Sequence, residues 1–340
     1  WLFGKITING VTLDLDSTVM TRYGTQDGAV RGYNPAKRGR ASHHPLMAFV
    51  ADLRMIANCW LRPGNSSSAN NVQAFLANTL HRLGDTRVCL LRADSGFSDS
   101  AFLDHLDTQP MHYIIALRQN QPLQRALVNA ESWWPLINEA GRPVAGIELT
   151  RFTYQPDAWS APRWVIGIRQ HIARRADPKG KTLNLFADDP VIGAWRFSAM
   201  TTDLDLPAET VWRMYRGRAD CENRIKELKY DFAADSFNMK DFWATEAALN
   251  VVMLAYNLMS LFRQVLLKTS LVRSSPAPVQ HTLQTLRYKL FAKAAYITTE
   301  ARKPILNLAM AMQQRVWMRG LWEASNTFDL PAKFSPVYSP

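Results

Sequence analysis

An alternation of apolar and polar residues opens the regular part of the chain. Residues 11–16 place an apolar side chain at every second position, namely Val11, Leu13 and Leu15. A period of two is typical of a β-strand, and Asn9-Gly10 directly before it is a turn signal. The stretches LMAFVADLRM (46–55) and IANCWL (56–61) predict two further strands.

The next elements alternate between helix and strand. The segment 66–83 predicts a helix with Ser66 to Ser68 as its cap region, and residues 87–94 form a short apolar run typical of a buried strand. A helix over 98–109 and a strand over 112–118 follow. The order of three strands, helix, strand, helix and strand predicts an α/β layer with a mixed sheet.

Two segments, 21–44 and 119–194, depart from this alternation. The first is Gly-rich and basic and predicts an excursion or hairpin. The second has short alternating runs such as 164–171, a basic loop at 173–181, and four tryptophans, Trp133, Trp134, Trp159 and Trp164. We expect an inserted β-rich subdomain there. Most of these tryptophans are expected to pack in a small core, with stacking on an unpaired base as the alternative.

From Leu206 onward the patterns are helical. The predicted helices cover 207–216, 218–231, 240–268, 279–293 and 303–323. The most apolar run, 248–267, contains Asn250, Asn257, Ser260, Arg263 and Gln264. A bilayer would bury these polar groups at high cost, so we expect a core helix and no membrane span.

The composition points to a folded protein with a polyanionic partner. The chain has 340 residues, of which 47% are hydrophobic and 20% are charged, which allows a substantial core. Lys and Arg number 40 against 29 Asp and Glu, a formal charge of +11. This surplus favours nucleic acid first and an anionic membrane surface second. The three cysteines, Cys59, Cys89 and Cys221, are expected to be reduced thiols. Because the chain starts at Trp1, we expect it to be a piece of a longer protein.

One polar stripe stands out in the segment YRGRADCENRIKELK (215–229). On a helix, four of its residues fall within about 60° of arc, namely Tyr215, Arg218, Glu222 and Lys229. A solvated charged face would also explain such a stripe. A site is favoured because a tyrosine shares the stripe and a lone carboxylate sits among cations.

Two more carboxylates end predicted buried strands. Asp16 ends the first strand and Asp94 ends the strand at 87–94, where a charge is costly unless it binds something. Each could instead simply cap a turn or a helix. With Glu222 they form a set of oxygen donors that suits Mg²⁺ or Mn²⁺, and two such ions can serve an in-line phosphoryl transfer. Asp14 lies on the same side of its strand as Asp16 and is an alternative first ligand, although Ser17-Thr18 directly after Asp16 favours Asp16.

These residues together resemble a known family. The spacing of Tyr215, Arg218, Glu222 and Lys229 resembles the signature of bacterial insertion-sequence DDE transposases, which have a ribonuclease H-like core. The two Asp motifs of that family resemble Asp16-Ser17-Thr18 and Asp94-Ser95-Gly96-Phe97, and the segment 23–46 is also similar. The resemblance covers roughly residues 10–320, in the correct order.

The resemblance implies a fold class and a division of the chain. The fold would be α/β, a ribonuclease H-like mixed sheet flanked by helices, interrupted by a β-rich insertion subdomain and followed by a helical C-terminal region. The expected parts are the first part of the core (1–118), the insertion (119–194), the second part of the core with the catalytic helix (195–235) and the C-terminal region (236–340).

The resemblance also implies a cut-and-paste reaction on DNA. Asp16, Asp94 and Glu222 would be the catalytic metal ligands for Mg²⁺ or Mn²⁺, with two ions bound. The partners would be transposon-end DNA, target DNA and a second copy of the chain in a homodimer. The location would be the bacterial cytoplasm, on DNA. By analogy, Tyr215, Arg218 and Lys229 would contact phosphates near the scissile bond.

The basic segment before residue 45 offers further candidates for contacts with DNA. Lys37, Arg38 and Arg40 are expected to contact phosphates, because they lie in a Gly-rich loop. His43 and His44 follow this basic run and are expected to face DNA or solvent. Gly217 weakens the signature helix by roughly 1 kcal/mol, so tertiary contacts must hold that turn.

Two other functions stay open at this level. A nuclease with the same core that does not transpose is disfavoured by the insertion and by the complete signature. A DNA-binding remnant without catalysis is disfavoured because all three acids are present. Both would differ from a transposase in a strand-transfer assay.

Overall fold

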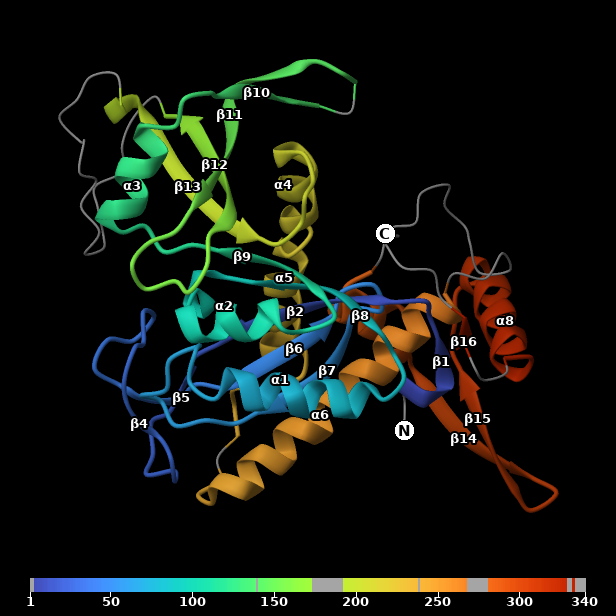
Figure 1. Cartoon of the computed structure of the whole chain (residues 1–340). Helices are drawn as coiled ribbons and strands as arrows, with labels where there is room; N and C mark the ends of the chain where they lie inside the picture. Colours follow the sequence, from blue (N-terminus) through green and yellow to red (C-terminus); the bar gives the residue numbers. More distant parts are fainter. Residues whose placement is uncertain are drawn as a thin grey trace.

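A nine-stranded mixed sheet forms the centre of the computed structural model, which describes residues 3–138, 140–172, 192–237, 239–267, 281–328 and 332–333. The strand order is β10-β11-β12-β13-β9-β8-β2-β6-β7 (Figure 1). The first five strands of this sheet along the chain are β2 (Val11–Ser17), β6 (Leu46–Val50), β7 (Met55–Trp60), β8 (Val88–Ala93) and β9 (His112–Ala116). The predicted order of strands and helices through residue 118 is therefore confirmed.

Strand β2 lies between β6 and β8. It is antiparallel to β6, with Ser17 opposite Leu46, and parallel to β8, with Leu15 opposite Ala93. Because parallel strands end at the same edge of a sheet, Asp16 and Asp94 lie side by side there. The alternation in 11–16 separates two faces that are both buried, because helices cover both faces of the sheet.

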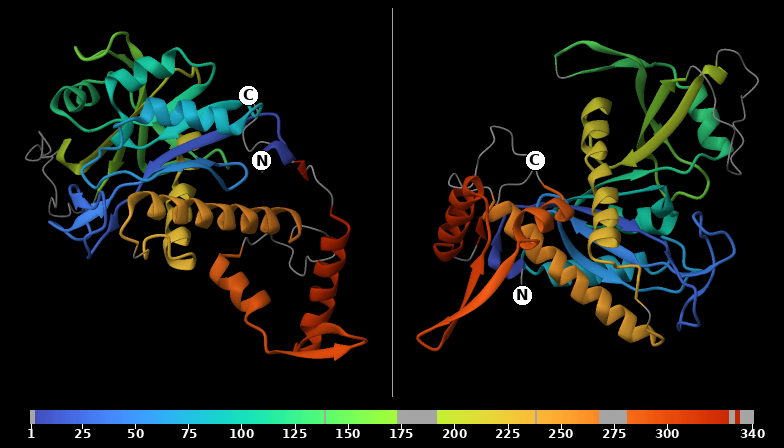
Figure 2. Two further views of the ribbon diagram at one scale, coloured as in Figure 1. Left: turned by 90° about the horizontal axis from the view of Figure 1, so that it is seen from below. Right: turned by 180° about the vertical axis from the view of Figure 1, so that it is seen from behind.

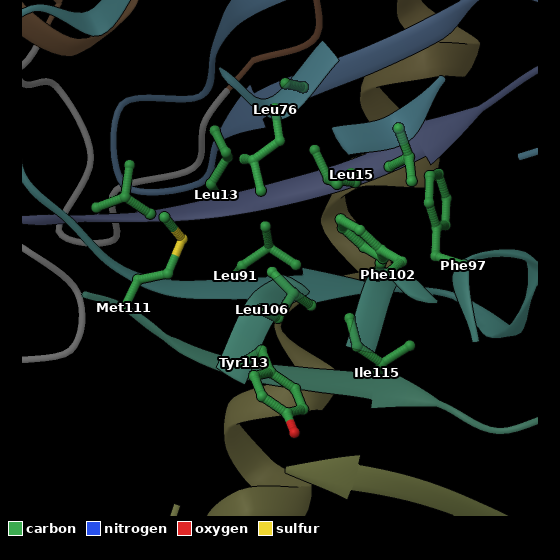
Figure 3. Packing of buried hydrophobic residues seen from close by; sticks show 14 of the residues in the cluster. Leu13, Leu15, Leu76, Leu91, Phe97, Phe102, Leu106, Met111, Tyr113 and Ile115 are labelled. Carbon is green, nitrogen blue, oxygen red and sulfur yellow. The ribbon is translucent and has the colours of Figure 1, made fainter. Parts of the chain in front are cut away.

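One face of the sheet is covered by α1 (Val72–Leu83) and α2 (Ser100–Asp107), and the other by α5 (Ala219–Asp231) and α6 (Phe242–Val265) (Figures 1 and 2). Figure 3 shows the core under α1 and α2, where leucines of β2 and β8 meet side chains of both helices. Helix α1 begins at Val72, so the predicted cap at Ser66 to Ser68 is wrong. The Ser67 backbone and hydroxyl instead bond the Asn70 side chain in a turn.

The β-rich segment extends the same sheet. After α3 (Gln121–Val128), the strands β10 (Trp134–Ile137), β11 (Pro143–Tyr154), β12 (Arg163–His171) and β13 (Trp195–Thr202) form an antiparallel ladder. This ladder joins the core where Met200 of β13 pairs with Ala116 of β9. Helix α4 (Ala208–Arg216) packs on it. The predicted basic loop at 173–181 lies outside the described residues.

Short elements complete the N-terminal half. The Gly-rich excursion is a small sheet of β3 (Met20–Thr21), β4 (Val30–Arg31) and β5 (Ala41–His43). The short strand β1 (Ile6–Thr7) follows a 3₁₀ turn at Phe3–Lys5 and pairs with β16 (Ala332–Lys333). Two further 3₁₀ turns lie at Ser95–Phe97 and Ile192–Ala194.

The C-terminal region contains a β-hairpin that the sequence patterns did not predict. Strands β14 (Ala295–Glu300) and β15 (Lys303–Leu308) pair between α7 (Leu283–Leu286), with its π-helical extension Arg287–Phe291, and α8 (Met312–Asn326). The prediction of a helix over 303–323 is therefore wrong for its first part. Ala301 and Arg302 have φ angles of 47° and 64°, and two left-handed residues form the tight turn that closes a two-residue hairpin. In Figure 2 (left) this region extends away from the sheet.

Helix α6 is the only helix of the described ranges that is long and apolar enough to cross a membrane by length and composition. Its buried polar residues are bonded to the sheet. The Asn257 side chain bonds both the N–H and the carbonyl of Ile56 at 2.7 and 2.8 Å, and the Ser260 hydroxyl donates to the carbonyl of Arg54 at 2.7 Å. These contacts match the predicted core helix. The three cysteines are free thiols, and Cys59 and Cys221 are buried, as predicted.

Candidate active site

Asp16 is the centre of a charged cluster at the carboxyl end of β2. Only 6% of the residue is exposed. One carboxylate oxygen accepts from the Ser17 N–H at 2.8 Å, and the other lies 3.1 Å from Nη2 of Arg218. Burial raises the pKa of Asp16 to about 6, against the lowering effect of Arg218, and the negative charges of Asp94 and Glu222 raise it further. The three carboxylates are therefore close enough to act on one another.

Asp94 follows β8 and begins a 3₁₀ turn. Its Oδ1 accepts from the Gly96 N–H at 2.8 Å, so this residue does cap a turn, as the simpler interpretation expected. Capping uses one oxygen of the carboxylate. The Asp94 charge also raises the pKa of Asp16, in agreement with the pairing of β2 and β8 that sets the two strand ends side by side.

The signature segment forms two helices, α4 and α5, joined at Gly217-Arg218. The junction is a tight turn in which Arg218 N–H bonds the Tyr215 carbonyl at 2.9 Å and Cys221 N–H bonds the Arg218 carbonyl at 2.8 Å. Both junction residues keep helical backbone angles. The polar stripe therefore continues across the junction.

All four signature residues act on Asp16. Arg218 pairs with it directly and also donates to the Leu15 carbonyl at 3.2 Å. Burial raises the pKa of Tyr215, and the charges of Asp94 and Asp16 add to this. Burial lowers the pKa of Lys229, and the charges of Asp235 and Asp16 partly oppose this shift. The Lys229 Nζ donates to the Val19 carbonyl at 2.9 Å. Glu222 is exposed in the first turn of α5, so its side chain can rotate within the site.

Asp14 has a different role in the structure. It is fully buried, and its two carboxylate oxygens lie 2.6 and 2.9 Å from Nε and Nη2 of Arg92. Nη1 of Arg92 donates to the Met214 carbonyl at the end of α4. This pair thus joins β2 and β8 to the α4–α5 junction and supplies the tertiary contact that Gly217 requires.

The donor set of the cluster fits a hard divalent cation. Asp94 and Glu222 both lie within electrostatic range of Asp16, and a cation would relieve the repulsion between these carboxylates. Within the described ranges, however, no group of three or more His, Cys, Asp or Glu side chains is arranged to hold a metal ion. In this structure the Arg218 guanidinium partly neutralises Asp16 instead.

The family of the chain follows from a comparison with family models. The model for transposase DDE domain group 1 matches residues 5–325. The chain belongs to this family. The predicted relationship to DDE transposases is therefore confirmed.

Other comparisons add little to the family assignment. No curated protein matches the chain. Seven solved chains match, among them a piggyBac transposase in a synaptic complex with hairpin DNA, determined by cryo-EM. That match has 13% identity and a TM-score of 0.41, and it covers 74% of this chain and 48% of the other. The chain thus spans about half the length of that transposase.

The predicted phosphate-binding loop of this transposase family member is exposed. Lys37, Arg38 and Arg40 project from the turn between β4 and β5, and Arg40 lies over the Tyr23 ring at 5.6 Å. No contact between described residues joins these three cations to Asp16. The loop is therefore separate from the carboxylate cluster.

Both histidines of the following segment are buried, so the expectation that they face solvent as loop residues is wrong, whereas contact with DNA stays a prediction. They lie where β5 leads into β6, and this corner packs against other elements. His43 Nε2 bonds the Asp27 carbonyl at 2.8 Å and its Nδ1 accepts from Arg22 Nε at 3.1 Å. His44 Nδ1 bonds the Ser66 carbonyl at 2.6 Å.

The tryptophans of the β-rich segment are mostly packed. Trp159 is buried and Trp133 packs partly buried against the same core. Arg151 lies 3.8 Å over the Trp164 ring. Trp134 is 45% exposed. The expectation that most of them pack in the core agrees with this arrangement.

Sequence patterns missed Arg92 and predicted the exposure of His44 wrongly. Arg92 is a charged residue within the otherwise apolar run VCLLRA, and an unpaired charge in a buried strand is a signal of a partner. His44 gave no such signal, because its burial depends on the β5–β6 corner.

Proposed function

We propose that this protein is a transposase that cleaves DNA at the ends of an insertion sequence and joins the freed ends to target DNA. The observation that carries the proposal is the convergence of Asp94, Glu222 and the basic signature residues on Asp16. Phosphoryl transfer on DNA needs carboxylates and cations in one place, because negative charge develops on the transferred phosphate. The family match supports the same conclusion.

Asp16, Asp94 and Glu222 are the proposed ligands for Mg²⁺ or Mn²⁺, with two ions bound. When bound, such ions polarise the attacking and leaving oxygens of the phosphodiester. Asp16 is favoured over Asp14 as the first ligand, since both oxygens of Asp14 are engaged by Arg92. Glu222 supplies the movable donor, because it is exposed on α5.

The cations of the site are proposed to bind DNA. Arg218 and Lys229 would hold phosphate oxygens near the scissile bond, and the Tyr215 hydroxyl would donate to a third. A phosphate drawn to Arg218 would also weaken its pairing with Asp16. Lys37, Arg38 and Arg40 would follow the backbone further along, because their side chains are exposed.

Assembly and location are part of the proposal. Two ends must be cut together, so a homodimer on DNA in the bacterial cytoplasm is the expected working form. The division into core (1–118 and 195–235), insertion (119–194) and C-terminal region (236–340) is proposed with it. The pairing of β13 with β9 supports a rigid connection between the insertion and the core.

A nicking and joining assay tests this function. The chain is incubated with Mn²⁺ and DNA that carries the terminal repeats of its own element, and 3′-hydroxyl ends and joined products are counted. Asp94→Ala and Glu222→Gln should lose both products while they still bind DNA. Glu209→Gln is the matched control, since this carboxylate pairs with Arg213 on α4 at 2.7 Å and lies outside the cluster.

The outcomes separate the three candidate functions. Cleavage and joining that are lost in both variants support a transposase. Cleavage without joining indicates a nuclease of the same core. Binding without cleavage in the wild type indicates a DNA-binding remnant, and cleavage that survives Asp94→Ala contradicts the assigned ligands.

A further inference from the structure

His44 stands where the chain enters the strand that pairs with β2. Leu46, two residues later, lies opposite Ser17, and the Thr18 N–H bonds the Pro45 carbonyl at 3.2 Å. The His44 backbone is therefore next to the end of β2 that carries Asp16. Only 6% of the residue is exposed, although it is not part of an apolar cluster.

The backbone of His44 is fixed by Arg62. The His44 N–H donates to the Arg62 carbonyl at 2.9 Å, and Arg62 Nε donates back to the His44 carbonyl at 3.0 Å. Nη1 of Arg62 also donates to the carbonyls of Ser67 and Asn70 at 2.8 Å each. One buried guanidinium thus holds His44 and the segment 66–70 together.

The ring of His44 is held in one tautomer. Nδ1 lies 2.6 Å from the Ser66 carbonyl, and a carbonyl oxygen can only accept, so Nδ1 carries the hydrogen. In the neutral ring, Nε2 is then a hydrogen-bond acceptor. No hydrogen bond from a described residue reaches Nε2. This nitrogen is therefore available to accept a hydrogen bond from a bound group.

The segment that anchors His44 also touches both aspartate motifs. The Ser68 hydroxyl lies 2.8 Å from the Ser17 hydroxyl. A Cβ at Gly96 would come within 2.7 Å of Ser68 Oγ and 2.9 Å of Asp94 Oδ1, so these groups are in close contact. His44, Ser17 and the Asp94 turn are therefore connected through one short segment, residues 66–68.

The charges around His44 agree with this geometry. Burial lowers the pKa of His44, the Ser66 hydrogen bond opposes this, and the Arg62, Asp94 and Lys229 charges also act on the ring. Burial thus favours the neutral ring, which lies within electrostatic range of one proposed metal ligand and one signature cation. A neutral acceptor suits a hydroxyl group and does not suit a phosphate oxygen.

We propose that His44 is a further active-site residue, whose Nε2 accepts a hydrogen bond from the attacking hydroxyl and so directs its oxygen at the phosphorus. The hydroxyl is water in strand cleavage and the DNA 3′-hydroxyl in strand transfer. This inference rests on the proposed function, since only a chain that cuts DNA presents a nucleophile there.

Two amide substitutions separate this role from a structural one. His44→Asn places an amide N–H where Nδ1 was, so it keeps the Ser66 bond and loses the acceptor. His44→Gln places an amide where Nε2 was, so it keeps an acceptor and loses the Ser66 bond. At saturating DNA we expect His44→Asn to lower the cleavage rate about 10²-fold with DNA affinity unchanged, and His44→Gln to lower it by clearly less. A structural role predicts the reverse order, which would overturn the proposal.

His43→Asn is the control for damage to this corner. Both ring nitrogens of His43 are bonded within the protein, so this change should lower the melting temperature without lowering the rate per folded molecule. Wild-type protein is assayed first. A wild type that does not cut refutes the proposed function, whereas a wild type that cuts beside an equally active His44→Asn refutes the inference alone.

Chemical modification gives a readout that does not depend on cleavage. Diethyl pyrocarbonate acylates unprotonated imidazole nitrogens, and mass spectrometry locates the modified residue. His44 should be modified in the free protein and protected by end DNA, while His43 stays unmodified in both. Equal modification of His44 with and without bound DNA would contradict the proposed position of Nε2.

Discussion

The two sides of the candidate site are built in different ways. On the strand side, Asp16 and Asp94 are fixed by the pairing of β2 and β8, and Asp16 is almost fully buried. On the helix side, Glu222 is exposed in the first turn of α5. A charge on the strand side therefore costs desolvation energy, whereas the Glu222 charge on the helix side stays in contact with water.

The strand side of the site is therefore rigid, and the helix side can move. The strand carboxylates cannot move without disturbing the sheet, whereas Glu222 can rotate around its own side chain. Arg218 and Arg92 connect the two sides, the first through Asp16 and the second through Asp14 and the Met214 carbonyl. The site thus depends on two buried arginines that bridge the strands and the signature helices.

The largest expected effect is on the DNA cleavage rate. Substitution of a carboxylate should lower this rate equally on the strand side and on the helix side. Asp16→Asn and Glu222→Gln should each lower the DNA cleavage rate by at least about 10⁴-fold, or about 5.5 kcal/mol of barrier, because each removes a proposed charged metal ligand. Single-turnover kinetics with Mn²⁺ measure this loss. The two sides should differ in stability, since Glu222→Gln is expected to change the free energy of unfolding by no more than about 0.5 kcal/mol. A cleavage rate that survives either change would contradict the ligand assignment.

The connection between the two sides is tested at Arg92. Arg92→Met leaves the buried Asp14 carboxylate without its guanidinium partner and should lower the free energy of unfolding by about 3–5 kcal/mol. Urea denaturation measures the loss. The double variant Asp14→Leu/Arg92→Met should recover most of it, since no buried charge then remains. Arg82→Met, at an exposed position of α1, is the control, and an equal loss there would show that the effect is not specific to the buried pair.

The burial of Asp16 predicts a pH dependence of the folding stability. The folded-state pKa of about 6 lies above the ordinary value of 3.8, so ionisation of Asp16 opposes folding. The contribution of Asp16 to the free energy of unfolding is then fully present below about pH 4. It is lost as the pH rises through 6, and the total loss is about 3 kcal/mol.

Denaturation of metal-free protein between pH 4 and 8 checks this dependence. Asn cannot ionise, so Asp16→Asn should gain stability relative to the wild type as the pH rises. Parallel curves for the wild type and Asp16→Asn would show that the Asp16 carboxylate is not destabilised in the fold.

The smallest effect is expected from substitution of exposed cations that belong to neither the strand side nor the helix side of the site. Substitution of Lys37, Arg38 or Arg40 by Ala should reduce the slope of log affinity against log salt by about 0.9 for each phosphate that the loop no longer neutralises. Fluorescence anisotropy with end DNA at several salt concentrations measures the slope. Arg82→Ala and Arg87→Ala are matched controls, because these exposed cations precede β8, at the opposite end of that strand from Asp94. An unchanged slope in the triple variant would remove this loop from the proposed DNA surface.

The sequence by itself determined the order of elements and the chemistry of the site. Alternation in 11–16 and the apolar runs of the following strands and helices are local patterns, so they predict the first five strands and the helices between them. The spacing in 215–229 likewise places its four side chains on one stripe, because helix geometry is local. The hairpin at 295–308 was missed, since its turn depends on backbone angles at Ala301 and Arg302 that these residue types seldom adopt.

Only the tertiary structure decided which groups meet at that stripe. The register of β2 with β8 sets Asp16 beside Asp94, and the packing of α5 brings Glu222 and Arg218 to them. The same packing engages Asp14 with Arg92 and turns His44 from a loop residue into a buried neighbour of the cluster. Such contacts join residues from 18 to more than 200 positions apart, and no local pattern encodes them, because they follow from which faces of strands and helices must be buried together.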